Sequence, residues 1–282
     1  MTDNHRGSLY MVTAMAGFAV EDMLIKSAAR AMPLGQVLAL MGALGILWFG
    51  LLSRRAAEPV FPAALRSRTM VLRSSFELMG RLFYSLAIAL IPLSVASAIL
   101  QATPLVVVAG AALIFGERVG LWRWALTIIG FSGVLVILRP GLEGFDALSL
   151  LAVAGLLGFA GRDLATRAAP PALSNAQLGT SGFAVLGVAG LVILAVQGGP
   201  ILPDAVTMAM ALGAAGFGIL GYSYLTRAMR TGEVSAVTPF RYSRLVFAMI
   251  LGVVLFAERP DMATLIGSAM IVGCGILILT RR

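Results

Sequence analysis

Long apolar stretches alternate with short polar connections along the whole 282-residue chain. A helix needs about 20 apolar residues to cross a bilayer core of about 30 Å, because each residue advances it by about 1.5 Å. Ten stretches are long enough, and they predict spanning helices near residues 8–28, 33–52, 69–91, 94–116, 120–138, 147–168, 174–196, 206–228, 235–256 and 261–280. The pattern therefore predicts an all-helical integral membrane protein.

The two halves of the chain resemble each other when one is shifted by 141 residues. GFA at 17–19 falls on GFA at 158–160, and LIFGER at 113–118 falls on VLFAER at 254–259. Such self-similarity is the sequence signature of a repeat architecture. Each half holds five spans, so the second half enters the membrane from the opposite side. We therefore expect two domains, residues 1–140 and residues 141–282, that are inverted five-helix repeats.

Composition agrees with a lipid environment. Hydrophobic residues make up 59% of the chain and charged residues 12%, with a mean hydropathy of +0.95. A soluble domain carries about 25% charged residues and could not bury this much apolar surface. The chain is therefore expected to contact the lipid bilayer directly.

The distribution of basic residues predicts the orientation. The connections on the side of both termini carry twelve basic residues, whereas the opposite side carries only Lys26, Arg30, Arg139 and Arg259. Basic residues accumulate in cytoplasmic loops, so we expect cytoplasmic termini. Most of the formal net charge of +8 then reflects topology, and we expect no nucleic-acid partner.

Residue types that support catalysis or metal binding are scarce. His5, the single histidine, lies in the polar N-terminal tail, and Cys274, the single cysteine, lies inside the last predicted span. No convergent set of nucleophile, base or metal ligands can be assembled from them. We expect a protein that is not an enzyme and that binds no metal and no cofactor.

The third predicted span carries charged residues at helical spacing. Arg73, Glu77 and Arg81 recur every four residues and form one stripe, which Tyr84 continues. Arg81 lies near mid-bilayer, whereas Arg73 is shallow enough to extend toward the headgroups. The stripe indicates either an internal salt bridge that locks the bundle or a water-filled cavity. We favour the cavity, because three charges cannot all pair with one another.

The repeat relates polar positions in the first and sixth spans. Asp22 is equivalent to Asp163, and Glu21 is equivalent to Arg162, although these two differ in sign. All four are candidates for gating or proton coupling, and ion pairs that hold helices together are the alternative. In the ninth span we expect Arg241 to reach the headgroups.

Inverted repeats are typical of alternating access, because two similar conformations arise when the halves exchange shapes around a central site. A secondary transporter is therefore the function we expect. A channel or a lipid scramblase would also suit a polar path through the membrane. Neither gives a reason for two inverted halves of five helices.

The ten spans and the paired endings FGER at 115–118 and FAER at 256–259 resemble the EamA repeats of the drug/metabolite transporter superfamily. Within it, GFAVED at 17–22 and the charges of the third and ninth spans most resemble YddG-type amino-acid exporters of the bacterial inner membrane. The resemblance covers essentially the whole chain. It implies that spans one, three, four, six, eight and nine surround a central cavity, and that the substrates are neutral amino acids, aromatic ones included.

A zwitterionic substrate would use the candidate residues in a simple way. Arg81 and Arg244 would bind its carboxylate and Glu77 its ammonium, while the rest of the molecule would contact Tyr84, Gln101, Tyr222 and Tyr224. An organic anion or nucleotide-like metabolite is the alternative substrate, because arginines are in excess, and a channel-like facilitator is the alternative mechanism. Proton coupling and the oligomeric state are open, and a monomer is compatible with the sequence.

Overall fold

The computed structural model describes residues 3–115, 120–139, 146–167, 173–231 and 238–280, which form helices without any strand. The helices of the first half are α1 (Asp3–Ala28), α2 (Leu34–Arg55), η1 (Ala63–Arg66), α3 (Arg68–Leu90), α4 (Leu93–Leu100), α5 (Thr103–Phe115) and α6 (Leu121–Leu138). Those of the second half are α7 (Ser149–Arg167), α8 (Asn175–Val196), α9 (Ala205–Arg230), η2 (Thr238–Tyr242), α11 (Ser243–Phe256) and α12 (Met262–Thr280). The predicted all-helical class is confirmed.

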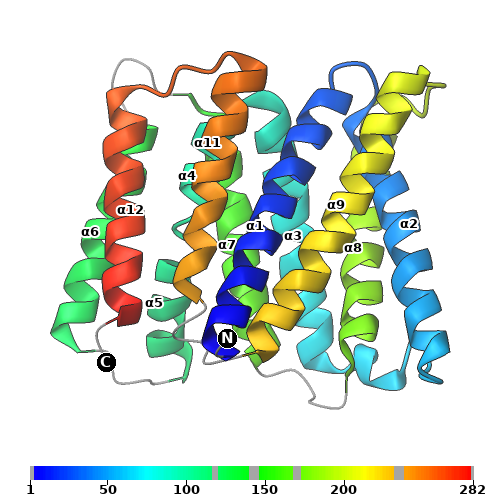
Figure 1. Ribbon diagram of the computed structural model, residues 1–282, viewed down its shortest axis with the longest axis horizontal. Coiled ribbons are helices and arrows are strands. Elements are labelled where there is room, and N and C mark those ends of the chain that lie inside the picture. The colour runs from blue at the N-terminus through cyan, green and yellow to red at the C-terminus, as the bar shows by residue number, and fades with distance from the viewer. Residues whose placement is uncertain (1–2, 116–119, 140–145, 168–172, 232–237, 281–282) are drawn as a thin grey trace.

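The two halves cross the bundle in opposite directions. The N-terminus and the C-terminus lie at the same end of the bundle, at the bottom of Figure 1. We call this end the terminal face and the opposite end the distal face. The first half finishes with α6 at the distal face, and α7 starts there and runs back. The chain is thus two inverted repeats of five membrane-crossing segments.

The fourth predicted span, 94–116, is not one helix but two. Gln101 and Ala102 separate α4 from α5. The cause is Pro104, which has no N–H to donate to the carbonyl of Leu100. The hydroxyl of Thr103 donates to that carbonyl instead, at 2.5 Å. The ninth span is also interrupted, because η2 precedes α11, and residues 235–237 of that prediction lie outside the described part of the chain.

Most helix starts follow local sequence signals. Ser174 and Gln177 form a capping box at the start of α8. Asp204 accepts hydrogen bonds from the backbone N–H groups of Val206 and Thr207 at the start of α9, and these bonds lower the pKa of its carboxyl. Such caps satisfy N–H groups that have no partner within the helix.

Helices pair across the two repeats. The closest neighbours are α2 with α8, α1 with α9, α3 with α7, and α6 with α12. Glycines allow this approach: a Cβ on Gly158 of α7 would lie 2.3 Å from the backbone nitrogen of Gly80 in α3. Small residues at such contacts are typical of helix packing in membranes. The α6–α12 pair lies at one edge of the bundle in Figure 1.

The outer surface is apolar. Four helical segments, 5–28, 34–55, 175–196 and 205–228, are long and apolar enough to cross a membrane by length and composition. Large apolar side chains such as Leu47, Trp48 and Leu51 of α2 point outward and are exposed. A surface of this kind is stable against lipid and not against water. Some charged side chains of the spanning helices, in contrast, are buried, among them Glu21, Asp22, Arg73 and Glu77.

The Gly158 contact gives a test of the packing. Gly158→Ala should lower the stability by about 1–3 kcal/mol, because its methyl group would overlap the backbone of α3. The thermal unfolding temperature of the detergent-solubilised protein measures the effect. Gly216→Ala is the matched control, because nothing lies within 4 Å of a Cβ there. Equal melting temperatures for the two variants would contradict this account of the α3–α7 contact.

Candidate functional site

Nine charged side chains of the described residues meet inside the bundle, from α1, α3, α7, η2 and α11. Five are arginines and four are carboxylates: Glu21, Asp22, Arg73, Glu77, Arg81, Arg162, Asp163, Arg241 and Arg244. A charge inside a membrane protein is retained only with a partner or with water, because its desolvation is costly. The pairing among these groups therefore defines the site.

The first group is centred on Asp22. Its Oδ2 atom accepts hydrogen bonds from Arg244, at 2.6 Å from Nη2 and 3.2 Å from Nε, and from the hydroxyl of Tyr84 at 3.1 Å. The Arg244 guanidinium also lies over the rings of Phe18 and Tyr84, at 5.2 and 5.5 Å from their centroids. Asp22 thus links α1 to α3 and to α11.

The second group is centred on Glu77. This carboxylate is 3.0 Å from Arg73 of the same helix and 3.8 Å from Arg162 of α7. Arg162 also donates to the neighbouring Asp163, at 2.8 and 3.0 Å, and Asp163 lies 3.8 Å from Arg241. Arg73 is buried and pairs with Glu77. Arg241 pairs with Asp163 instead of reaching the headgroups.

Among the four carboxylates of this set, Glu21 has the most distant charged partner, which is Arg81. Their nearest charged atoms are 3.9 Å apart, and Arg81 Nε is buried without a hydrogen-bond partner. Arg81 lies 5.9 Å from the centroid of the Phe159 ring, and Arg162 lies 4.9 Å from the same ring. Phe159 therefore connects this pair to the second group.

Most of the predicted site residues lie in or beside these groups. Gln101 is buried at the break between α4 and α5 and donates to the carbonyl of Arg241 at 3.0 Å. Tyr222 interacts electrostatically with Arg73, Glu77 and Arg162, and its ring packs on Phe49 and Phe183. These contacts place Gln101 and Tyr222 at the second group.

Tyr224 does not join them. Its ring is 5.7 Å from that of Tyr10 and lies beneath Arg227, near the terminal end of α1. Phe159 was noted only as part of the internal repeat, and its place at the site was not predicted, since an apolar ring in a spanning helix carries no signal of its own. Among the described residues no three His, Cys, Asp or Glu side chains gather as a possible metal site.

An inverted ten-span bundle with a buried polar centre defines a membrane transporter of small molecules. The profile of the EamA-like transporter family matches residues 5–139 and again residues 147–281. The chain belongs to this family. The expected membership in the drug/metabolite transporter superfamily is confirmed, whereas the narrower YddG-type resemblance is not tested.

Several curated relatives are transporters. The pseudopaline exporter CntI of Pseudomonas aeruginosa is 29% identical over 98% of this chain and 97% of its own length. The S-adenosylmethionine uptake transporter of Rickettsia prowazekii is 25% identical over 74% of this chain and 70% of its own. The riboflavin transporter of Rhizobium johnstonii is 28% identical over 69% of this chain, and the match spans 64% of that relative, which is just under two thirds.

A solved structure shares the fold. A protein crystal structure with 21% identical residues superposes with a TM-score of 0.66, over 97% of this chain and 98% of the other. The likeness supports the arrangement of the helices across the whole chain.

The Asp22 contacts generate a stability prediction. Asp22→Asn should destabilise the protein by about 3–5 kcal/mol, because it leaves the buried Arg244 charge without its partner. Tyr84→Phe removes one hydrogen bond to a charge and should cost about half as much. Thermal unfolding in detergent measures both. The double variant Asp22→Asn/Arg244→Gln should recover part of the loss, and no recovery would show that the pair is not coupled.

Proposed function

We propose that the protein is a secondary transporter that exports small zwitterionic metabolites, neutral and aromatic amino acids among them, across the bacterial inner membrane by alternating access. The observation that carries the proposal is the loose pair of Arg81 and Glu21 among tighter ion pairs. The other interior carboxylates have charged partners at 2.6–3.0 Å. Arg81 and Glu21 are therefore the charges most available to a substrate.

A zwitterion fits between these two side chains. Its carboxylate would accept hydrogen bonds from the Arg81 guanidinium, including the Nε atom that has no partner. Its ammonium would approach Glu21, so one long ion pair would be exchanged for two short ones. We prefer Glu21 to Glu77 for the ammonium, because Glu77 lies 3.0 Å from Arg73 and 3.8 Å from Arg162. A charged pair in a low-dielectric site gains more from such contacts than it would in water.

Aromatic rings lie beside the Arg81–Glu21 pair. Phe159 lies beneath Arg81, and the Tyr84 ring is 6.0 Å from the Phe159 ring in an edge-to-face arrangement. Ligand sites commonly combine apolar and aromatic walls with a few polar groups that fix orientation. This lining supports a substrate with an apolar or aromatic side chain.

The relatives support transport of small metabolites, and the pseudopaline exporter, which is matched over nearly its whole length, supports export. A second candidate substrate class is organic anions. It is favoured by the interior excess of five arginines over four carboxylates, which leaves net positive charge at the site.

Alternating access follows from the inverted architecture. Equivalent surfaces of the two repeats lie at opposite faces, so a rearrangement that closes one mouth opens the other. The cross-repeat pairs, such as α1 with α9 and α3 with α7, are the contacts that such a rearrangement would shift. The central charges would then face the two sides in turn.

The orientation can be tested with single cysteines in a Cys274→Ala background. Ala31 and Leu202 are exposed in the α1–α2 and α8–α9 connections, which lie at the distal face, and Ala56 is exposed just after α2, whose end lies at the terminal face. With cytoplasmic termini, a membrane-impermeant maleimide should label Ala31→Cys and Leu202→Cys in intact cells and should leave Ala56→Cys unlabelled until the cells are opened. The reverse pattern would place the termini outside.

The role of Arg81 can be tested by counterflow in proteoliposomes. Arg81→Leu should raise the apparent substrate constant tenfold or more, since a charge-assisted contact worth about 1.5–3 kcal/mol is lost. The panel should contain neutral amino acids, the matching amines without a carboxylate, and the matching acids without an ammonium. Arg54→Leu, an exposed arginine at the end of α2, is the control and should transport as the parent does.

The panel also separates the two substrate classes. Preference for the zwitterions over both truncated sets supports the proposal. Equal transport of the acids without an ammonium would favour the organic-anion candidate. Unchanged affinity in Arg81→Leu would remove Arg81 from the binding site and leave Arg244 as the next arginine to test.

A further inference from the structure

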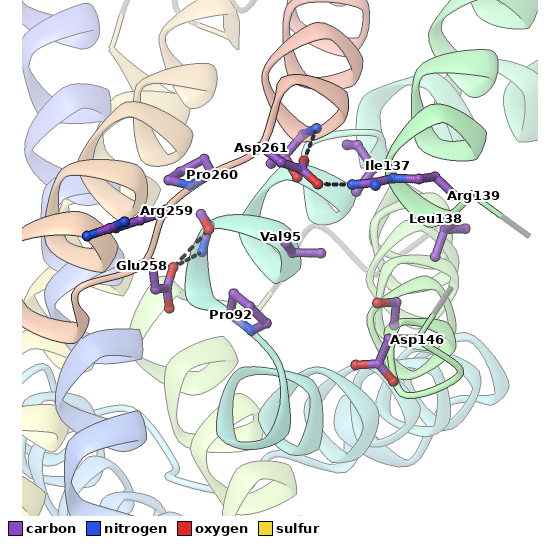
Figure 2. Close-up of a pocket in the computed structure, with 13 residues that line it drawn as sticks. Pro92, Val95, Ile137, Leu138, Arg139, Asp146, Glu258, Arg259, Pro260 and Asp261 are labelled. Carbon is purple, nitrogen blue, oxygen red and sulfur yellow. Dashed lines mark hydrogen bonds and ion pairs between the residues drawn. The ribbon is translucent and has the colours of Figure 1, made fainter. Parts of the chain in front are cut away.

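At the distal end of the bundle, the carboxylate of Glu258 lies against the start of α4 (Figure 2). The backbone N–H of Leu93 donates to its Oε1 at 2.6 Å. The backbone N–H and the hydroxyl of Ser94 donate to its Oε2, at 3.0 and 2.8 Å. These donors form the start of α4, where a negative charge is favourable because the N–H groups are otherwise unpaired. Glu258 therefore fastens the connection after α11 to the end of α4.

Lys26 of α1 extends this contact to two further helices. Its Nζ atom donates to the carbonyls of Ile88 and Ile91, at 3.0 and 2.5 Å, and lies 3.9 Å from Glu258 Oε1. Both side chains are about nine-tenths buried. One carboxylate and one ammonium thus join the distal ends of α1, α3, α4 and α11.

The local sequence holds Glu258 in place. Ala257 has a left-handed backbone with φ of 53°, and the N–H of Glu258 donates to the carbonyl of Gly252 at 3.0 Å. A Cβ on Gly252 would lie 2.4 Å from Glu258 Oε2, so the carboxylate needs a glycine there. The backbone conformation thus directs the Glu258 side chain toward α4, and this side chain packs against α11.

We propose that Glu258, with Lys26 and Ser94, is the latch that keeps the distal mouth of the transport path closed, an inference that rests on the proposed alternating access. Glu258 belongs to the second repeat, and Lys26 and Ser94 belong to the first. The contact therefore crosses the two halves at one face, which is where the halves must part. Opening the distal mouth breaks these bonds and frees the start of α4.

The short helix α4 suits this role. It has eight residues and ends at the break that Pro104 causes. Because α4 and α5 are not one continuous helix, α4 can tilt while α5 stays in place. Its deeper turns carry Ser97, which is buried, and approach Tyr84 of the central site. Movement of α4 would connect the distal face with the substrate-binding charges.

The internal repeat supports a function for this set of residues. A shift of 141 residues carries Glu258 onto Glu117 and Ser94 onto Ser235, and it carries Lys26 onto Arg167. The carboxylate, the hydroxyl and the cation each fall on a residue of the same chemical type. This is expected if the two halves supply equivalent contacts at opposite faces of the membrane. The side chains of the equivalent residues lie outside the described part of the structure, and the proposal concerns the distal set alone.

The latch can be tested with a buried reporter, Ser97→Cys, in a Cys274→Ala background. A small membrane-impermeant thiol reagent is added to intact cells, and Leu202→Cys confirms that it reaches the distal face. Glu258→Gln, and separately Lys26→Met, should increase the labelling rate of the reporter by about tenfold, because contacts to charged groups are lost. Asp261→Asn is the matched control. Asp261 and Glu258 both line a distal pocket of about 300 Å³, but Asp261 pairs with Arg139, which follows α6, and the labelling rate of the control should equal that of the parent.

The outcomes separate the latch from the transport proposal, because labelling needs no substrate. Fast labelling in the parent, unchanged labelling in both latch variants, or an equal increase in Asp261→Asn would each overturn the latch. Loss of folding in both variants, seen as aggregation on size-exclusion chromatography, would assign Glu258 and Lys26 a purely structural role and overturn it too. Failure of the substrate proposal would appear only in counterflow, as unchanged affinity in Arg81→Leu.

Discussion

Neutralisation of charge in a low-dielectric interior is the constraint on which the rest of the structure depends. Breaking a buried pair costs several kcal/mol, so interior arginines such as Arg162 and Arg244 fix the place of carboxylates on other helices. Asp22 with Arg244 and Glu77 with Arg162 both join the first repeat to the second. The same pairs that hold the halves in register also gather the polar groups that a substrate could use.

The charged centre includes positions that are equivalent in the two repeats, but the charges at these positions are not symmetric. Glu21 and Arg162 are equivalent by the repeat, yet they differ in sign. The residues that face them explain the difference. Glu21 lies against Gly218, whereas the position equivalent to Gly218 in the first half is Glu77, which pairs with Arg162. The sign at each of these two positions therefore follows the residue that it faces. None of the charged residues of α3 has a charged counterpart on α9.

Much of the fold was predictable because it follows from lengths of apolar sequence. Lipid requires long helices with satisfied backbones, so the ten spans and the inversion could be predicted from pattern. The family was expected from the resemblance of the paired endings FGER at 115–118 and FAER at 256–259 to EamA repeats. The break at Gln101 was harder, since Pro104 indicated a kink but not that Thr103 would bond to the carbonyl of Leu100. Pairing between helices was not predictable: the stripe on α3 suggested unpaired charge, and only the fold shows that α1 and α7 supply Glu21 and Arg162 to it.

The long separation between interior partners has a consequence for biosynthesis. Asp22 and Arg244 are 222 positions apart, so α1 enters the bilayer well before α11 has been made. Arg73 with Glu77, and Arg81 with Glu21, can pair within the first half as it is inserted. Among the described interior residues of the first half, Arg73 and Arg81 already have these partners, so Asp22 pairs with Arg244 of the second half. The interior part of the second half carries an excess of positive charge. Docking of the two halves is therefore completed late, when the ribosome has released the last helices, and the early chain is the form most exposed to quality control in the membrane.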